Sequence, residues 1–249
     1  MSRYRLCILS CLLNLAAWVS VAQSAPSQSS SSSSSSKHSA KAAPADSGLE
    51  TGSVSNGLYR NKSLGFTCKI PDGWVLRTEE MNAGEDERNK SGEEDREARG
   101  RTAEGGCPHN CSKVLLAAFS RPPEAKGEEV NSSILIAAES ADAYPGLKDA
   151  LQYFEPLTEV AKAQGFLVDE APYEFAVGSK TLVRSDFHKD VGTRVMRQST
   201  LAMLSLGYAV SFTVIGGSED EVEELIDRLE FQPAPRSHPA QRGPGQLPK

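Results

Sequence analysis

The stretch GYAVSFTVIGGSEDEVEELIDRLEF, residues 207–231, contains the clearest strand and the clearest helix of the sequence. Apolar residues alternate with small or polar ones from Tyr208 to Val214, which predicts a β-strand. Ser218 and Glu221 then form the S-x-x-E pattern that caps the start of a helix. The helix has one apolar stripe, made of Val222, Leu225, Ile226 and Leu229. The stretch therefore predicts a strand, a helix and a short closing strand.

Further elements lie on the N-terminal side of this stretch. The apolar runs at residues 112–120 and 132–140 predict two buried strands, and residues 179–189 and 193–204 predict two more. Between these pairs, residues 144–166 predict a helix that starts at Pro145, ends near Gly165 and is kinked or broken near Glu155, because Pro156 removes a backbone hydrogen bond. This order predicts an α+β fold with an antiparallel β-sheet and helices packed on it.

The segment NKSLGFTCKIPDGW, residues 61–74, opens the predicted domain. Phe66, Cys68 and Ile70 alternate with polar residues, and the Pro-Asp-Gly sequence that follows is a turn signal. We therefore expect Cys68 to point into the core as a small apolar side chain.

The segment also resembles the GF…IP.GW opening of the Mog1/PsbP-like α/β/α sandwich, through Gly65, Phe66, Ile70, Pro71, Gly73 and Trp74. The closing helix with its short strand resembles the end of that fold, and the resemblance covers residues 57–232. More loosely, the chain resembles secreted bacterial proteins of unknown function. Members of the group bind partners, such as a small GTPase or the lumenal face of a photosystem. The resemblance implies a binding or accessory module, and it assigns no site residues.

The two ends of the chain predict export and disorder. Residues 1–22 have basic residues, an apolar run and small residues at the cleavage position, as in a secretory signal peptide. Residues 23–56 form a Ser/Ala-rich tether and residues 233–249 a Pro/Gly-rich tail, and both compositions predict disorder. The domain is expected at residues 57–232, with a charged, solvated insertion at 79–106. We expect a secreted or periplasmic protein with no stable membrane span after cleavage.

The loop GGCPHNCSKV, residues 105–114, is the strongest candidate for chemistry. Cys107 and Cys111 form a local disulfide, remain free thiols, or bind a metal with His109 and His188 as further ligands. Since structural zinc sites usually have four ligands and a C-x2-C pair, the disulfide is the preferred interpretation. We therefore expect no cofactor.

A second candidate is SDFHKD, residues 185–190, where Asp186, His188 and Asp190 alternate along a strand. Such a face binds a cation or holds a general base, and with Ser185 it would form a hydrolase site. A solvated strand face is the alternative.

The net charge of −6, with no basic stripe, gives no reason to expect nucleic-acid binding. The sequence therefore predicts an exported, non-enzymatic module that binds a protein or another component of the cell envelope. The alternative is a metal-binding or thiol-redox protein built on the CPHNC loop. Sequons for N-glycosylation start at Asn61, Asn89, Asn110 and Asn131.

Overall fold

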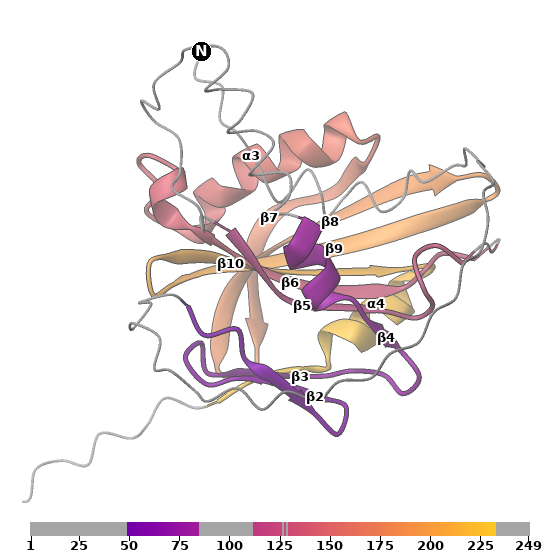
Figure 1. Ribbon diagram of the computed structural model, residues 1–249. Coiled ribbons are helices and arrows are strands. Elements are labelled where there is room, and N and C mark those ends of the chain that lie inside the picture. The colour runs from indigo at the N-terminus through magenta and orange to yellow at the C-terminus, as the bar shows by residue number, and fades with distance from the viewer. Residues whose placement is uncertain (1–48, 85–111, 126, 128, 233–249) are drawn as a thin grey trace, which may run out of the picture.

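The computed structural model describes residues 49–84, 112–125, 127 and 129–232, which form two antiparallel sheets (Figure 1). The larger sheet has the order β4-β5-β6-β10-β9-β8-β7, and the smaller has the order β1-β2-β3-β11. The strands of the larger sheet are β4 Val75–Leu76, β5 Ser112–Phe119, β6 Ser133–Ser140, β7 Leu167–Val177, β8 Lys180–Val191, β9 Arg194–Ser205 and β10 Tyr208–Gly216. Those of the smaller sheet are β1 Ser53–Ser55, β2 Leu58–Asn61, β3 Phe66–Lys69 and β11 Leu229–Phe231. The helices are α3 Ala150–Ala163, α4 Glu219–Ile226, the 3-10 turn η2 Ala141–Ala143 and residues 78–84.

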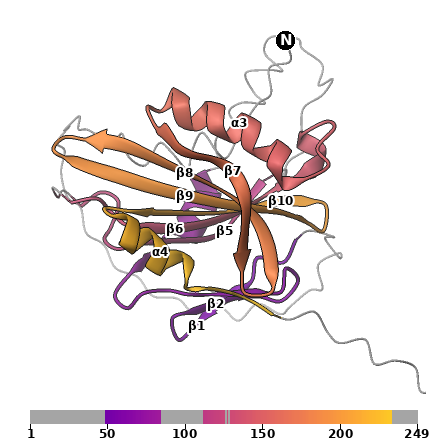
Figure 2. The same cartoon turned by 180° about the vertical axis from the view of Figure 1, so that it is seen from behind.

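The larger sheet is covered on both faces. Helix α3 packs on one face, and the smaller sheet with α4 packs on the other (Figure 2). Successive side chains of β10 point to opposite faces of the larger sheet. Val210 and Phe212 face the smaller sheet, while Ala209 lies in the cluster with α3. The predicted α+β class is confirmed, and the sheet is split in two because residues 58–69 and 229–231 pair with each other.

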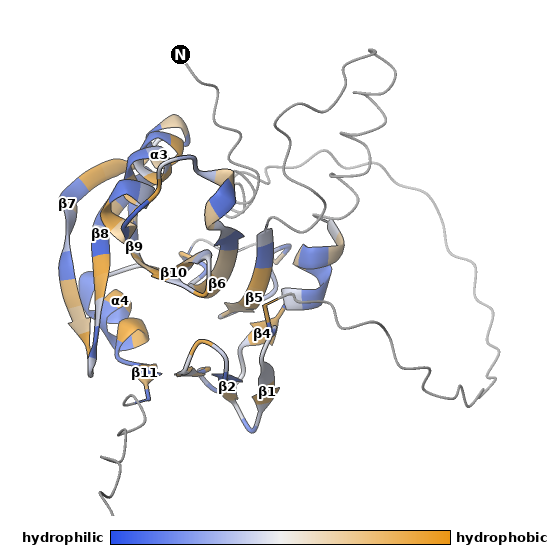
Figure 3. Cartoon of the chain, turned by 90° about the vertical axis from the view of Figure 1, so that its left-hand side faces the viewer, coloured by the Kyte–Doolittle hydropathy of each residue, from blue (hydrophilic) through white to orange (hydrophobic). Residues whose placement is uncertain are grey.

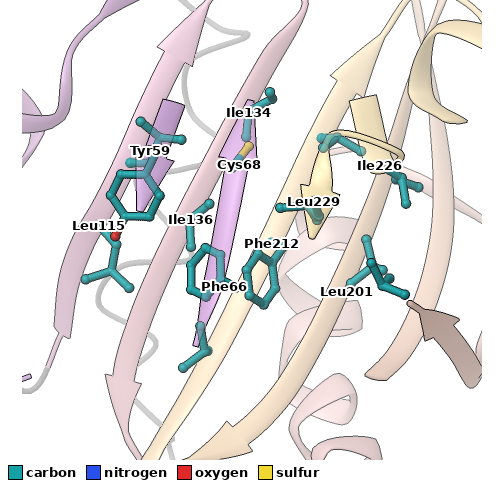
Figure 4. Close-up of a cluster of buried hydrophobic side chains, with 14 of the residues drawn as sticks. Tyr59, Phe66, Cys68, Leu115, Ile134, Ile136, Leu201, Phe212, Ile226 and Leu229 are labelled. Atoms are coloured by element: carbon teal, nitrogen blue, oxygen red, sulfur yellow. The ribbon is translucent and has the colours of Figure 1, made fainter. Parts of the chain in front are cut away.

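An aromatic cluster joins the two sheets (Figure 4). Phe66 of β3 is fully buried and contacts Phe212 of β10 edge-on, with ring centroids 4.9 Å apart. Cys68 lies buried in the same cluster, as the alternation of β3 predicted, and its thiol is free. Burial raises the pKa of its thiol to about 12, so this cysteine is inert at neutral pH.

The strand–helix–strand prediction for residues 207–231 is confirmed. Ser218 is the N-cap of α4, and its hydroxyl accepts a hydrogen bond from the Glu221 amide at 3.2 Å. Glu221 reaches back to the amide of Gly217 at 2.8 Å, one residue earlier than in a standard capping box. The buried residues of α4 are Val222, Leu225 and Ile226, which belong to the predicted stripe.

The predicted start of the middle helix is wrong, and of the two alternatives near Glu155 the one with two separate helices is wrong. Helix α3 begins at Ala150, after the N-cap Asp149, whose carboxylate accepts from the Gln152 amide at 2.9 Å. It is one helix through Pro156. The carbonyl that Pro156 leaves without a donor belongs to Gln152, an exposed residue, and water can satisfy it. The predicted end at Gly165 is confirmed by its positive φ of 85°.

Part of the predicted tether and part of the predicted insertion belong to the folded domain, so the predicted boundaries of both segments are corrected. Residues 49–56 contain β1 and a segment that Tyr59 and Asn61 hold by hydrogen bonds to the carbonyls of Thr51 (2.7 Å) and Glu50 (2.8 Å). Residues 78–84 are helical, and Met81 packs on the cluster of Val114 and its neighbours. The signal peptide, residues 23–48 of the tether, residues 85–106 and the tail lie outside the described residues.

Strand β7 has no counterpart among the sequence predictions. It contains Asp169, Glu170, Pro172 and Glu174, residue types that are rare in strand interiors. It is the edge of the larger sheet, where neither a missing amide donor nor a charged side chain is costly. The composition of residues 167–177 therefore did not predict this strand, which pairing with β8 stabilises.

Candidate functional site

An open cleft of about 860 Å³ lies where helix α4 begins. Its first wall comes from the end of β5 and the segment before β6, its second from the start of β9, and its third from the turn into α4. The residues that line it are Ser120, Arg121, Glu129, Val130, Ser132, Arg194, Val195, Arg197, Gly217, Ser218, Glu219, Asp220 and Glu221. Only the two valines are apolar, so the cleft is a polar surface with charges of both signs.

Glu221 joins the walls of the cleft. Its carboxylate accepts hydrogen bonds from the Ser132 hydroxyl and from the Gly217 amide. The preceding glycine, Gly216, gives it room, because a Cβ there would lie 3.1 Å from the carboxylate. Glu221 therefore positions the cleft and is not a free acid.

Asn131 holds the first wall. Its side-chain oxygen accepts from the Ser120 hydroxyl at 3.0 Å and the Arg121 amide at 3.2 Å, and its amide nitrogen donates to the Arg121 carbonyl at 3.0 Å. The Arg121 guanidinium donates to the Glu129 carbonyl through Nη2. Its Nε is buried and has no hydrogen-bond partner in the described part of the chain. The cleft wall thus contains a cationic donor that its own surroundings leave unused.

A chain of ion pairs runs from the cleft to the predicted SDFHKD site. Arg197 bridges Glu219 of α4, at 2.9 Å, and Asp169 of β7, at 3.7 Å. Asp169 is also in contact with the Nδ1 atom of His188. His188, which the sequence singled out, therefore pairs with Asp169 and not with Asp186 or Asp190.

The other residues of that predicted site make separate contacts. Asp186 accepts from Arg184 Nε at 3.0 Å and from the Tyr173 hydroxyl at 3.2 Å. Ser185 is fully buried, and its hydroxyl donates to the Glu170 carbonyl at 2.7 Å. The hydrolase arrangement is therefore not formed, because Ser185 and His188 have different partners.

Arg184 fastens α4 to β8. The side chain is almost fully buried, its Nη groups contact both carboxylate oxygens of Glu223, and its guanidinium lies 4.8 Å from the centre of the Phe175 ring. Burial, together with the Asp186 carboxylate, raises the pKa of Tyr173 to about 12. These contacts keep the helix that forms one wall of the cleft in place.

A second polar cluster lies under the opposite end of β6. The Tyr144 hydroxyl donates to Glu139, which is buried, and the Tyr144 and Tyr153 rings are 5.3 Å apart. Burial and the Glu139 carboxylate raise the pKa of both tyrosines well above 10. This cluster secures the start of α3 and is remote from the cleft along β6.

The CPHNC residues Cys107, His109 and Cys111 lie outside the described residues, so the disulfide, free-thiol and metal interpretations stay predictions. Among the residues that are described, no group of three or more histidines, cysteines or carboxylates is arranged to hold a metal ion. Of the sequons, Asn61 is fully buried and Asn131 is held in the cleft wall. Both therefore have structural roles.

Comparison with solved structures finds chains of similar architecture. CyanoP, the cyanobacterial PsbP of Synechocystis, is 15% identical, with 70% of this chain and 91% of that chain covered and a TM-score of 0.39. The Ran-binding protein Mog1p of Saccharomyces cerevisiae is 12% identical, with coverages of 68% and 80% and a TM-score of 0.32. LpqN of Mycobacterium tuberculosis, which is involved in cell envelope biogenesis, is 11% identical, with coverages of 68% and 83% and a TM-score of 0.32.

The predicted Mog1/PsbP-like resemblance is confirmed. At these identities the resemblance concerns the fold alone. No family model matches the sequence, and no curated protein matches it. Within the described ranges, the chain has no helix that is long and apolar enough to cross a membrane.

Proposed function

We propose that this chain is an exported, non-enzymatic binding module, and that the cleft at the start of α4 holds a charged segment of a partner protein in the cell envelope. Export is inferred from the signal-like residues 1–22. The observation that carries the proposal is the composition of the cleft wall, in which charged and hydroxyl side chains outnumber the two valines.

The size and polarity of the cleft favour a protein partner over a small molecule. Pockets for small ligands are mostly apolar with a few placed polar groups. Protein interfaces tolerate charged surfaces, because complementary charges guide association and fix its register. Arg194 and Asp220 line the cleft and have no ion pair with any described residue, so both charges are available to a partner.

The contacts of Glu221 favour binding over catalysis. Both of its carboxylate oxygens accept hydrogen bonds, one from Ser132 and one from Gly217. A general base needs an acceptor that is free to take a proton from a substrate. Glu221 instead fixes the walls of the cleft.

The test is a charge reversal in the cleft with a matched reversal elsewhere. Arg194→Glu places a negative charge in the cleft, whereas Lys69→Glu makes the same change at an exposed position of the smaller sheet. The tagged proteins are crosslinked in a cell-envelope extract, and the captured partners are quantified by mass spectrometry. We expect Arg194→Glu alone to lower recovery of a specific partner. Equal recovery with both variants would contradict the proposal.

A further inference from the structure

Strand β7 forms the outer boundary of the larger sheet (Figure 3). It pairs with β8 on one side, and no other backbone hydrogen bond reaches residues 167–177 within the described ranges. An edge strand leaves a row of amide and carbonyl groups toward solvent, and an added strand can pair with them.

The two edges of the larger sheet differ in how they are protected. At the β5 edge, β4 covers only two residues of β5. Beyond them, Asn82 exchanges two hydrogen bonds of 2.9 Å with the Val114 backbone, and Thr78 accepts from the Ala117 amide at 3.0 Å. Side chains thus form hydrogen bonds with the outward backbone groups of β5. In the described chain, no side chain from another segment does the same for the outward backbone groups of residues 173–177.

The bulges and the proline of β7 are confined to its first half. The register shifts between Val168 and Glu170 and again between Glu170 and Tyr173, and Pro172 lacks an amide donor. From Tyr173 to Val177 the pairing with β8 is unbroken. Residues 173–177 therefore form a regular edge without a bulge or a proline, and Glu174 is its one charged residue.

The charge of β7 indicates what would pair with it. Its charged side chains are all acidic: Asp169, Glu170 and Glu174. Arg184, on the neighbouring strand, is already paired with Asp186 and Glu223. A basic partner is therefore complementary, whereas a second copy of this acidic chain, with its net charge of −6, is disfavoured.

We propose that residues 173–177 bind an extended, basic segment of a partner protein as an additional strand of the larger sheet. In this mode the backbone supplies the hydrogen bonds, and alternate side chains supply selectivity. Glu174, which is exposed, selects for lysine or arginine. None of residues 173–177 lines the cleft at the start of α4.

The probe is a short, capped peptide of alternating lysine and valine, and a glutamate–valine peptide is its control. Hydrogen exchange of the full chain, read by mass spectrometry, should slow at residues 173–177 when the lysine peptide is added. Glu174→Lys should weaken its binding about fivefold, since an attraction becomes a repulsion across the strand pair. Glu155→Lys, the same change at an exposed position of α3, and Arg194→Glu in the cleft should leave it unchanged.

Four results would overturn the proposal: no protection, protection elsewhere, equal binding of the glutamate peptide, or equal effects of Glu174→Lys and Glu155→Lys. Dimerisation through β7, detected by light scattering and slowed exchange at the same residues, would show that a second copy occupies the edge. Since Arg194→Glu tests the cleft alone, failure here leaves the proposed function standing.

Discussion

Replacing Phe66 by alanine tests whether the smaller sheet is part of one cooperative core. Phe66 is fully buried, and its ring centroid lies 4.9 Å from that of Phe212, 5.7 Å from Tyr59 and 5.7 Å from Phe231. Phe212 belongs to the larger sheet and the others to the smaller one. The substitution therefore leaves a cavity between the sheets and removes ring contacts from both.

Truncation of a buried phenylalanine to alanine costs about 3–5 kcal/mol. The free energy of unfolding of a domain is about 5–15 kcal/mol, so Phe66→Ala should remove a large share of it. Phe66→Leu keeps most of the volume and should cost about 1 kcal/mol. Urea unfolding, followed by circular dichroism, measures both variants, with the difference appearing as a lower midpoint at a similar slope. A cost below about 1 kcal/mol for Phe66→Ala, equal to that of Phe66→Leu, would refute the reasoning.

Three further results are expected. Ser218→Ala removes the N-cap of α4 and should lower the free energy of unfolding by about 1 kcal/mol, whereas Ser218→Asp should largely retain it; urea unfolding measures both. Cys68 should resist alkylation in the native protein at pH 8 and react once urea unfolds it, as read by peptide mass spectrometry, because burial raises the pKa of its thiol to about 12. Burial raises the pKa of Tyr59 to about 12 from an ordinary value of about 10, so its neutral form stabilises the fold below pH 10, and this contribution is lost as the pH rises toward 12. Thermal unfolding should show a smaller alkaline loss in Tyr59→Phe; an unchanged pH dependence would contradict this assignment.

Patterns that report burial predicted much of the fold. Strands β5, β6 and β10 are short apolar runs, and both of their faces are buried, so their composition stands out in the sequence. The cap of α4 depends on Ser218 and Glu221, which are three residues apart, and such local contacts can be recognised in a sequence. Cys68 alternates with polar neighbours and is buried, as expected.

The sequence did not predict the features that depend on contacts between residues far apart in the chain. Strand β7 is acidic and contains Pro172, and its partner β8 stabilises it. Residues 49–52 are held by the side chains of Tyr59 and Asn61, a contact that composition does not indicate. The low apolar content of these residues predicts disorder, whereas hydrogen bonds to buried side chains give them order.

The cleft was not predictable from sequence. Ser132 and Glu221 are 89 positions apart, and each has a common structural role of its own. In the sequence, Arg194 and Arg197 follow a turn and fit the pattern of ordinary surface residues of a strand. Only the sheet order, which places β9 beside β10 and β10 beside β6, brings these side chains together around the cleft.

The most direct test of the cleft as the contact site is site-specific photo-crosslinking at two exposed apolar residues on the same strand pair. Val195 lines the cleft and is 37% exposed, whereas Leu206 follows the other end of β9 and is 62% exposed. A photoreactive residue at each position, activated in intact cells, should yield a defined protein adduct from Val195 and none from Leu206. An adduct from Leu206 alone, or identical adducts from both positions, would contradict the account.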